Sequence, residues 1–141
     1  MTGDDDVVVT LDEAAAWEFL RSQPVGRLAY HLLGEVHIVP VNYAVTDRRI
    51  VFRTAPGSKL LGIVMDQDVA FEADRYDLER ATSVVARGVA NLLAESEADA
   101  VRDLPVESWV LTDKDEVVAI DVRDISGRSF VLDRRERARS A

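Results

Sequence analysis

The sequence predicts a mainly β protein, a small antiparallel β-barrel that carries a few short helices. Several runs rich in Val, Ile, Tyr and Leu lie between about residues 27 and 132, and such residues favour strands. Short turns join most consecutive runs, which is typical of antiparallel neighbours. About six or seven strands in a chain of 141 residues favour a closed barrel over an open sheet.

The first predicted element is a helix over residues 11–23. Thr10 and Glu13 have the spacing of a capping box. Behind them, apolar residues recur at helical spacing: Leu11, Ala14, Ala15, Phe19 and Leu20. Pro24 and Gly26 end the helix. Residues 1–10 are predicted to form an acidic N-terminal extension.

Three strands are predicted next, over residues 27–33, 36–45 and 49–54, with turns at Gly34-Glu35 and Thr46-Asp47-Arg48. Pro40 interrupts the second run, which indicates an edge strand or a bulge. A turn at Ala55-Pro56-Gly57-Ser58 then opens a short helix over about residues 58–66.

The remaining elements are two strands, a helix and two closing strands. The first strands cover 68–74 and 82–93, and an acidic helix covers 95–103. The closing strands cover 116–122 and 129–132, around a turn at Ser126-Gly127-Arg128. Residues 11–132 are therefore predicted to form a single domain, and the Arg-rich residues 133–141 a mobile tail.

The composition excludes several classes of protein. The formal charge of -9 argues against non-specific binding to nucleic acid or to an anionic membrane surface. The chain has no cysteine, which excludes disulfides, a thiolate nucleophile and a zinc site built on thiolates. No apolar run approaches the ~20 residues needed to cross a bilayer, and the N-terminus is acidic, unlike a signal peptide. A cytoplasmic location is expected.

A cationic turn is the strongest local feature of this acidic chain. Arg53 and Thr54 end a strand, and Ser58 and Lys59 open the short helix that follows. Two cations, a hydroxyl and the N–H groups of a helix start together favour an anion such as a phosphate monoester. The alternative is a helix cap beside two solvated surface cations.

Other polar groups give weaker indications. Glu72 and Asp74 share one face of a predicted strand, so they form either an acid–base pair or part of a solvated face. His31, Glu35 and His37 lie close on a predicted hairpin, but alternation gives no assurance that they converge, and no metal site is predicted. Because no nucleophile–base pair can be assembled, redox chemistry would require a bound cofactor.

The order of several short motifs carries a family resemblance. They are Val25-Gly26-Arg27-Leu28-Ala29, Val39-Pro40-Val41-Asn42-Tyr43, Phe52-Arg53-Thr54, Gly57-Ser58-Lys59-Leu60, residues 69–74, residues 83–90, Trp109, Lys114 and residues 125–130. In this order they resemble the pyridoxamine 5'-phosphate oxidase-like family of flavin-binding split barrels. The resemblance spans roughly residues 11–132.

This resemblance implies a six-stranded antiparallel split barrel that forms a homodimer and holds FMN in a cleft between two protomers. It implies that Arg53, Thr54, Ser58 and Lys59 bind the FMN phosphate. It also implies that the ring lies along Val39, Pro40, Val41 and Asn42. Trp109 is either near the ring of the partner protomer or part of the core or dimer interface. Arg87 either joins the phosphate cluster or pairs with a carboxylate.

The implied function is an FMN-dependent oxidoreductase that acts on an unidentified small substrate. The ordered sequence lacks the additional C-terminal basic residues that hold the phosphate of pyridoxamine phosphate, so oxidation of that compound is not expected. One alternative is a deazaflavin-dependent reductase on the same fold, as in actinobacterial relatives; the Arg-rich, Lys-poor composition suits a high-GC bacterium. Another is a non-catalytic module that binds a flavin or haem.

Overall fold

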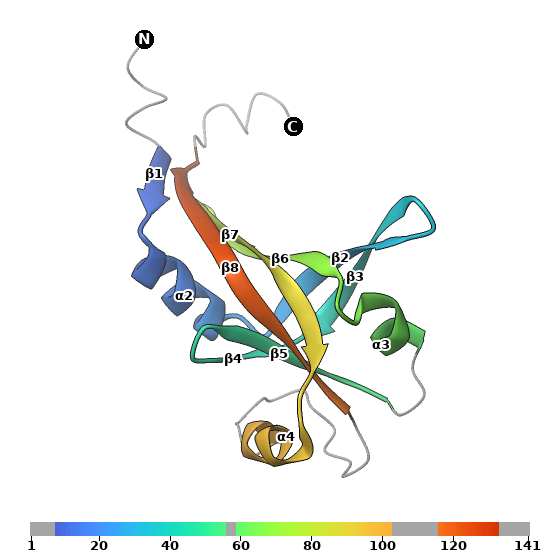
Figure 1. The fold of residues 1–141 in the computed structure, drawn as a ribbon. Coiled ribbons are helices and arrows are strands. Elements are labelled where there is room, and N and C mark those ends of the chain that lie inside the picture. The colour runs from blue at the N-terminus through green and yellow to red at the C-terminus, as the bar shows by residue number, and fades with distance from the viewer. Residues whose placement is uncertain (1–7, 56–58, 103–115, 133–141) are drawn as a thin grey trace.

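The structure, a computed structural model, describes residues 8–55, 59–102 and 116–132. These residues form one curled antiparallel sheet of eight strands with three short helices (Figure 1). The mainly β fold class and the split-barrel architecture are thereby confirmed, with the sheet forming a half-barrel. Eight strands are present instead of six because β1 and the short β4 also join the sheet.

The strands follow one another along the sheet in the order β3-β2-β6-β7-β8-β5-β4, and β1 pairs separately with β8. Their bounds are β1 Val8–Leu11, β2 Val25–Leu32, β3 Glu35–Asn42, β4 Ala44–Thr46, β5 Arg49–Thr54, β6 Asp68–Tyr76, β7 Arg80–Leu92 and β8 Glu116–Val131. The predicted strands are therefore present, although the run 36–45 divides at Tyr43 into β3 and β4. β1 was not predicted: its first three residues belong to the segment 1–10 that was expected to precede the barrel, and Leu11 was expected to start the helix.

The β2–β3 hairpin places β3 at one end of the sheet. Its two-residue turn is Leu33-Gly34, one position earlier than predicted, and both residues have positive φ. Pro40 pairs with Arg27 of β2, and β3 has no second strand neighbour within the described sheet. The prediction of an edge strand at Pro40 is confirmed, and the missing N–H of proline is tolerated there.

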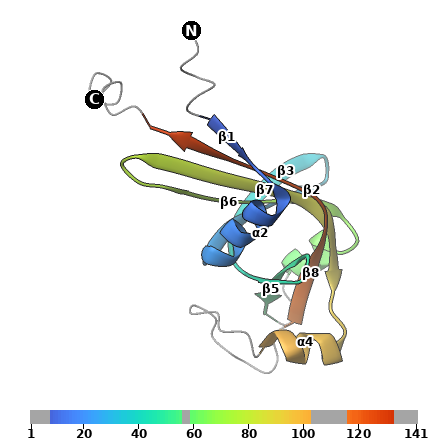
Figure 2. The same cartoon turned by 90° about the vertical axis from the view of Figure 1, so that its left-hand side faces the viewer.

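Helix α2 (Glu13–Ser22) lies on the concave side of the curled sheet (Figure 2). The predicted capping box is wrong: Asp12 caps the helix by accepting a hydrogen bond from the Ala15 N–H at 2.8 Å. Thr10 is unavailable for this role because it belongs to β1 and pairs with Arg128. The helix buries Ala16, Trp17 and Leu20 in the core.

Strand β8 corrects a second prediction. A turn was expected at Ser126-Gly127-Arg128, but these residues continue one 16-residue strand, Glu116–Val131. Gly127 pairs with Val84 on one side and with Leu11 on the other. A Cβ at Gly127 would lie 3.0 Å from side-chain atoms of both Leu11 and Val84. The glycine therefore permits a close approach of neighbouring side chains and does not mark a turn.

Two apolar clusters hold these elements together. The larger lies under α2 and α3 (Lys59–Val64) and contains Phe52, Phe71 and Leu28. Inside it, the Tyr43 hydroxyl donates to the Leu20 carbonyl at 2.7 Å, and burial raises the pKa of this phenol. The smaller cluster lies under α4 (Glu95–Arg102), on the opposite face of β5 and β8, because Val51, Val117 and Ala119 alternate with the residues of the larger cluster. Arg49 ties α4 to the sheet through ion pairs with Glu97 and Asp121, both at 2.8 Å.

Candidate functional site

Three of the residues predicted to bind a phosphate lie within the described chain, Arg53 and Thr54 at the end of β5 and Lys59 at the start of α3, and we call this set the cationic corner. Arg53 and Thr54 pair with Val117 and Glu116 of β8, so the sheet fixes their backbone. The Thr54 side chain is 7% exposed, and its Oγ1 is buried without a hydrogen-bond partner among the residues the structure describes. Such a group costs about 1–3 kcal/mol, and it could donate to an anion that reaches it.

Lys59 supplies the second cation of the corner. It is exposed and is the first residue of α3. The helix is held by Leu60, Ile63 and Val64, which pack against the main core. This packing fixes the base of the Lys59 side chain, while its ammonium group stays in solvent. Ser58, the other predicted phosphate ligand of this turn, lies outside the described residues.

The segment predicted to follow a bound ring is the second half of β3. Val39 and Val41 pack against the main core, so their side chains are committed to the fold. The Asn42 side-chain nitrogen donates to the Pro24 carbonyl at 3.3 Å. Because β3 ends the described sheet, its outer row of backbone N–H and C=O groups is left for another partner.

Arg87 forms the carboxylate pair that was one of its two predicted alternatives. Its Nη1 lies 3.6 Å from Oδ2 of Asp124 on the neighbouring strand β8. Both side chains are more than half exposed, so the pair contributes little to stability. A register shift between Arg87 and Gly88 sets this pairing. Trp109, the predicted aromatic neighbour of the ring, lies outside the described residues.

A charged cluster on the outer sheet face joins both predicted carboxylates to a residue that was not predicted to contact them. Arg27 Nη1 lies 2.8 Å from Glu72 Oε1 and 3.5 Å from Asp74 Oδ2. Arg27 and Glu72 are opposed residues of β2 and β6. Burial, followed by a hydrogen bond with Asp74 and the charge of Asp74, raises the pKa of Glu72 to about 7 despite Arg27. One proton is therefore held between two carboxyl groups near neutral pH.

This cluster predicts a falling stability as the pH rises. Because its pKa is raised from 4.5 to about 7, Glu72 binds its proton more tightly in the folded chain than in the unfolded chain. The resulting stability is fully present below about pH 4.5 and is lost as the pH rises through 7. Glu72→Gln mimics the protonated form, so we expect a higher midpoint of thermal unfolding than the parent at pH 8 and an equal one at pH 5.

The control for this experiment is Glu18→Gln, since the Glu18 side chain is 79% exposed on α2. It should leave the pH dependence of unfolding unchanged. If the midpoint of thermal unfolding changed with pH in the same way for the parent and for Glu72→Gln between pH 5 and pH 8, Glu72 would not hold this proton.

The two histidines do not assemble a metal site with their neighbours. His37 Nε2 lies 3.5 Å from Glu35 Oε2, and the His37 ring stacks on Tyr30 with centroids 5.6 Å apart. No group of three or more His, Cys, Asp or Glu side chains suited to a metal ion occurs within residues 8–55, 59–102 and 116–132. Over the same ranges, none of the helices has the length and apolar character needed to span a membrane.

Comparisons with known proteins identify relatives of this chain and solved structures with the same fold. A family profile described as pyridoxamine 5'-phosphate oxidase matches residues 12–129. An uncharacterized protein of Mycobacterium tuberculosis is 34% identical over 135 residues, which cover 91% of this chain and 89% of the relative. The solved structure of an FAD binding protein from Mycobacterium smegmatis is 32% identical, with a TM-score of 0.75, and covers 88% of this chain and 99% of that one.

A conserved protein of unknown function from Corynebacterium diphtheriae gives the same TM-score of 0.75 at 36% identity. That match covers 89% of this chain and 100% of the solved chain. The relatives therefore match this chain over nearly their full length and share its fold.

Proposed function

The chain belongs to the pyridoxamine 5'-phosphate oxidase family, and from this premise we propose that it is a flavin-dependent oxidoreductase acting on a small substrate. The cationic corner of Arg53, Thr54 and Lys59 would hold the flavin phosphate. The relative from Mycobacterium smegmatis, described as an FAD binding protein, supports a flavin ligand.

The observation that carries this proposal is the buried Thr54 hydroxyl, which follows Arg53 at the end of β5. A phosphate oxygen would accept the hydrogen bond that Oγ1 does not make within the described chain. Arg53 and Lys59 would neutralise the phosphate through charge-assisted hydrogen bonds. When bound, the flavin would supply the hydride or electron transfer that the side chains cannot perform.

The flavin that best suits this corner is FMN. Two cations and one hydroxyl match a single phosphate monoester, as FMN carries, whereas FAD and a deazaflavin with an acidic tail need further neutralisation. Residues 133–141 carry a net charge of +2, so the other 132 residues have a net charge of -11. The excess of negative charge on the protein disfavours the binding of a cofactor with a long anionic tail.

We further propose that the protein acts as a homodimer, with Trp109 of each protomer placed near the flavin of the other. The outer face of β3 carries Val36 and Ile38, which are 70% and 65% exposed. Large apolar side chains exposed side by side on a sheet face suit a subunit contact. A dimer formed there would also cover the open edge of β3, along which we expect the ring to lie.

The test of this function is the absorption spectrum of the purified protein, followed by titration with FMN, FAD and a deazaflavin. We expect flavin bands or stoichiometric FMN binding, a dimer by light scattering, and reduction of bound FMN by a nicotinamide nucleotide. Saturable FMN binding without reduction by any donor would favour a binding module over an enzyme. A failure to bind all three cofactors would refute the flavin proposal.

Thr54→Val separates the ligand role of Thr54 from a structural one. Valine has nearly the same shape, and removing a buried hydroxyl without a partner should leave the free energy of unfolding unchanged or raise it by up to about 1 kcal/mol. If the hydroxyl donates to the phosphate, FMN affinity should fall about tenfold. Titration calorimetry and chemical denaturation of the same samples measure both quantities, and equal FMN affinities would remove Thr54 from the site.

A further inference from the structure

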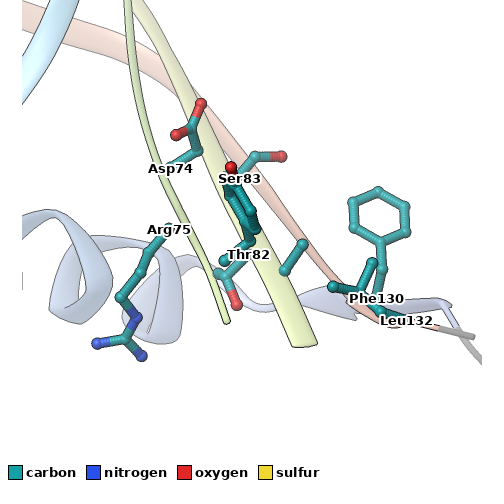
Figure 3. Close-up of a pocket in the computed structure, with 8 residues that line it drawn as sticks. Asp74, Arg75, Thr82, Ser83, Phe130 and Leu132 are labelled. Carbon is teal, nitrogen blue, oxygen red and sulfur yellow. The ribbon is translucent and has the colours of Figure 1, made fainter. Parts of the chain in front are cut away.

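A second candidate binding region lies at the opposite end of β8 from the cationic corner. It is a cavity of about 310 Å³ on the β6–β7 hairpin and the end of β8 (Figure 3), within the size range of small-molecule sites. The residues that line it are Asp74, Arg75, Tyr76, Ala81, Thr82, Ser83, Phe130 and Leu132. Phe130 is 13 residues along β8 from Val117, the partner of Arg53, so the two regions are roughly 40 Å apart along that strand.

The floor of this cavity is a small residue between two aromatic ones. Tyr76 of β6 pairs with Ala81 of β7, and Ala81 pairs with Phe130 of β8. Neighbouring strands in a sheet are about 4.8 Å apart, so the backbones of Tyr76 and Phe130, which lie two strands apart, are separated by about 9.6 Å. A flat ring needs about 3.5 Å to each neighbouring face, or about 7 Å in total. The Ala81 methyl group leaves that space open, and we call this region the aromatic slot.

Polar groups lie one row further along the same sheet face. Asp74 pairs with Ser83, and both line the cavity. The Asp74 carboxylate is 43% exposed beside Arg27, and it can accept further hydrogen bonds. The alternate residues belong to the other face: Arg75 lies over the Phe19 ring of α2 at 6.0 Å, and the Thr82 hydroxyl is 3.3 Å from that of Ser129. Figure 3 shows Asp74 and Phe130 on one side of the sheet and Arg75 and Thr82 on the other.

The rim of the slot is apolar and open to solvent. Tyr76, which lines the cavity, is 70% exposed although it is a large aromatic residue, and Leu132 adds a further apolar side chain to the lining. Side chains of this kind gathered around a cavity mark a place where apolar surface becomes covered by a ligand. The exposure of Tyr76 also means that it can be replaced without disturbing the core.

We propose that the aromatic slot binds a planar nitrogen heterocycle whose N–H or amino edge donates to Asp74 and Ser83. The ring would lie on Ala81 between Tyr76 and Phe130, whose aromatic side chains add to the apolar burial, with the Arg128 guanidinium over the Phe130 ring at 5.7 Å from its centroid. The carboxylate selects a ligand edge that donates hydrogen bonds over one that only accepts them. This site does not depend on the phosphate corner, so it extends beyond the proposed flavin function.

The experiment uses the full chain and a phosphate-free probe, 2-amino-4-hydroxypteridine, titrated by calorimetry. We expect saturable binding to the parent and at least a tenfold loss in Ala81→Trp, because an indole fills the space above the floor. Asp74→Asn should weaken binding about tenfold, since the charged acceptor is lost. Tyr76→Ala, which removes an exposed wall of the slot, should also weaken binding. This variant keeps the proposal testable if Ala81→Trp fails to fold.

Lys59→Glu serves as the matched control, and it should bind the probe as the parent does while losing FMN. Three results would overturn the proposal: no saturable binding of the probe to the parent, undiminished binding to a folded Ala81→Trp or Tyr76→Ala variant, or loss of the probe in Lys59→Glu. The last result would show that the probe occupies the cationic corner. Failure of FMN, FAD and the deazaflavin to bind the parent would refute the flavin proposal and leave the slot result intact.

Discussion

Gly88→Ala should destabilise the protein by about 3 kcal/mol or more, because an added Cβ has no space at this position. The atom would lie 2.1 Å from the Asp121 carbonyl oxygen and 2.8 Å from its carbonyl carbon. Both contacts are with backbone, so no side-chain rotation can relieve them. Gly88 also lies at the register shift between β7 and β8, where relief would require the two longest strands to separate.

The measurement is chemical denaturation followed by circular dichroism. Gly62→Ala is the matched control, because a Cβ at Gly62 meets nothing within 4 Å and the residue lies inside α3. That variant should gain about 0.5–1 kcal/mol from the better helix propensity of alanine. If Gly88→Ala lost less than about 1 kcal/mol, the close approach of β7 and β8 at this bulge would be wrong.

Lys59→Glu should abolish the retention of FMN while the protein stays folded. The substitution puts a carboxylate where the proposed site needs a cation beside the phosphate, and bringing two like charges together in this way costs several kcal/mol. FMN affinity should therefore fall at least thirtyfold. Since Lys59 is exposed, the free energy of unfolding without ligand should change by less than about 0.5 kcal/mol.

Arg21→Glu makes the same change of charge at a site remote from the corner. Arg21 lies at the end of α2, where its side chain is 47% exposed beside Glu18. This variant should retain FMN as the parent does, and the absorbance ratio of flavin to protein after gel filtration compares the two. A Lys59→Glu protein that purifies as yellow as Arg21→Glu would remove Lys59 from the proposed site.

Local patterns predicted most of the elements, and the main errors occurred where distant segments decide the structure. The runs that form β2, β5, β6 and β7 have strand composition in themselves, so they could be identified directly. Ser126-Gly127-Arg128 has the composition of a turn, but Val84 and Leu11 lie on both sides of Gly127 and keep it in β8. Likewise, Thr10 cannot cap α2 because β8 holds it in a strand. Pairing over more than 100 residues leaves no local pattern.

The same distinction applies to the sites. Arg53 and Thr54 of the cationic corner are adjacent and Lys59 follows after four residues, so the sequence alone could indicate an anion site there. Glu72 and Asp74 could be placed on one face of a strand by alternation. Their partner Arg27, 45 residues before Glu72, is brought in by the pairing of β2 with β6. The aromatic slot draws its three central residues from three strands, so it could not be foreseen from any one segment.

The length of β8 has a consequence for the order in which the protein folds during synthesis. β1, β5 and β7 all pair with this strand, which ends at Val131. Most of the sheet therefore depends on contacts between residues far apart in the chain, a topology that folds slowly. Before β8 has been synthesised, the strands β5 and β7 each lack a neighbour along one edge and could pair with other chains. The acidic charge of the nascent chain, by mutual repulsion, would oppose that association until β8 arrives.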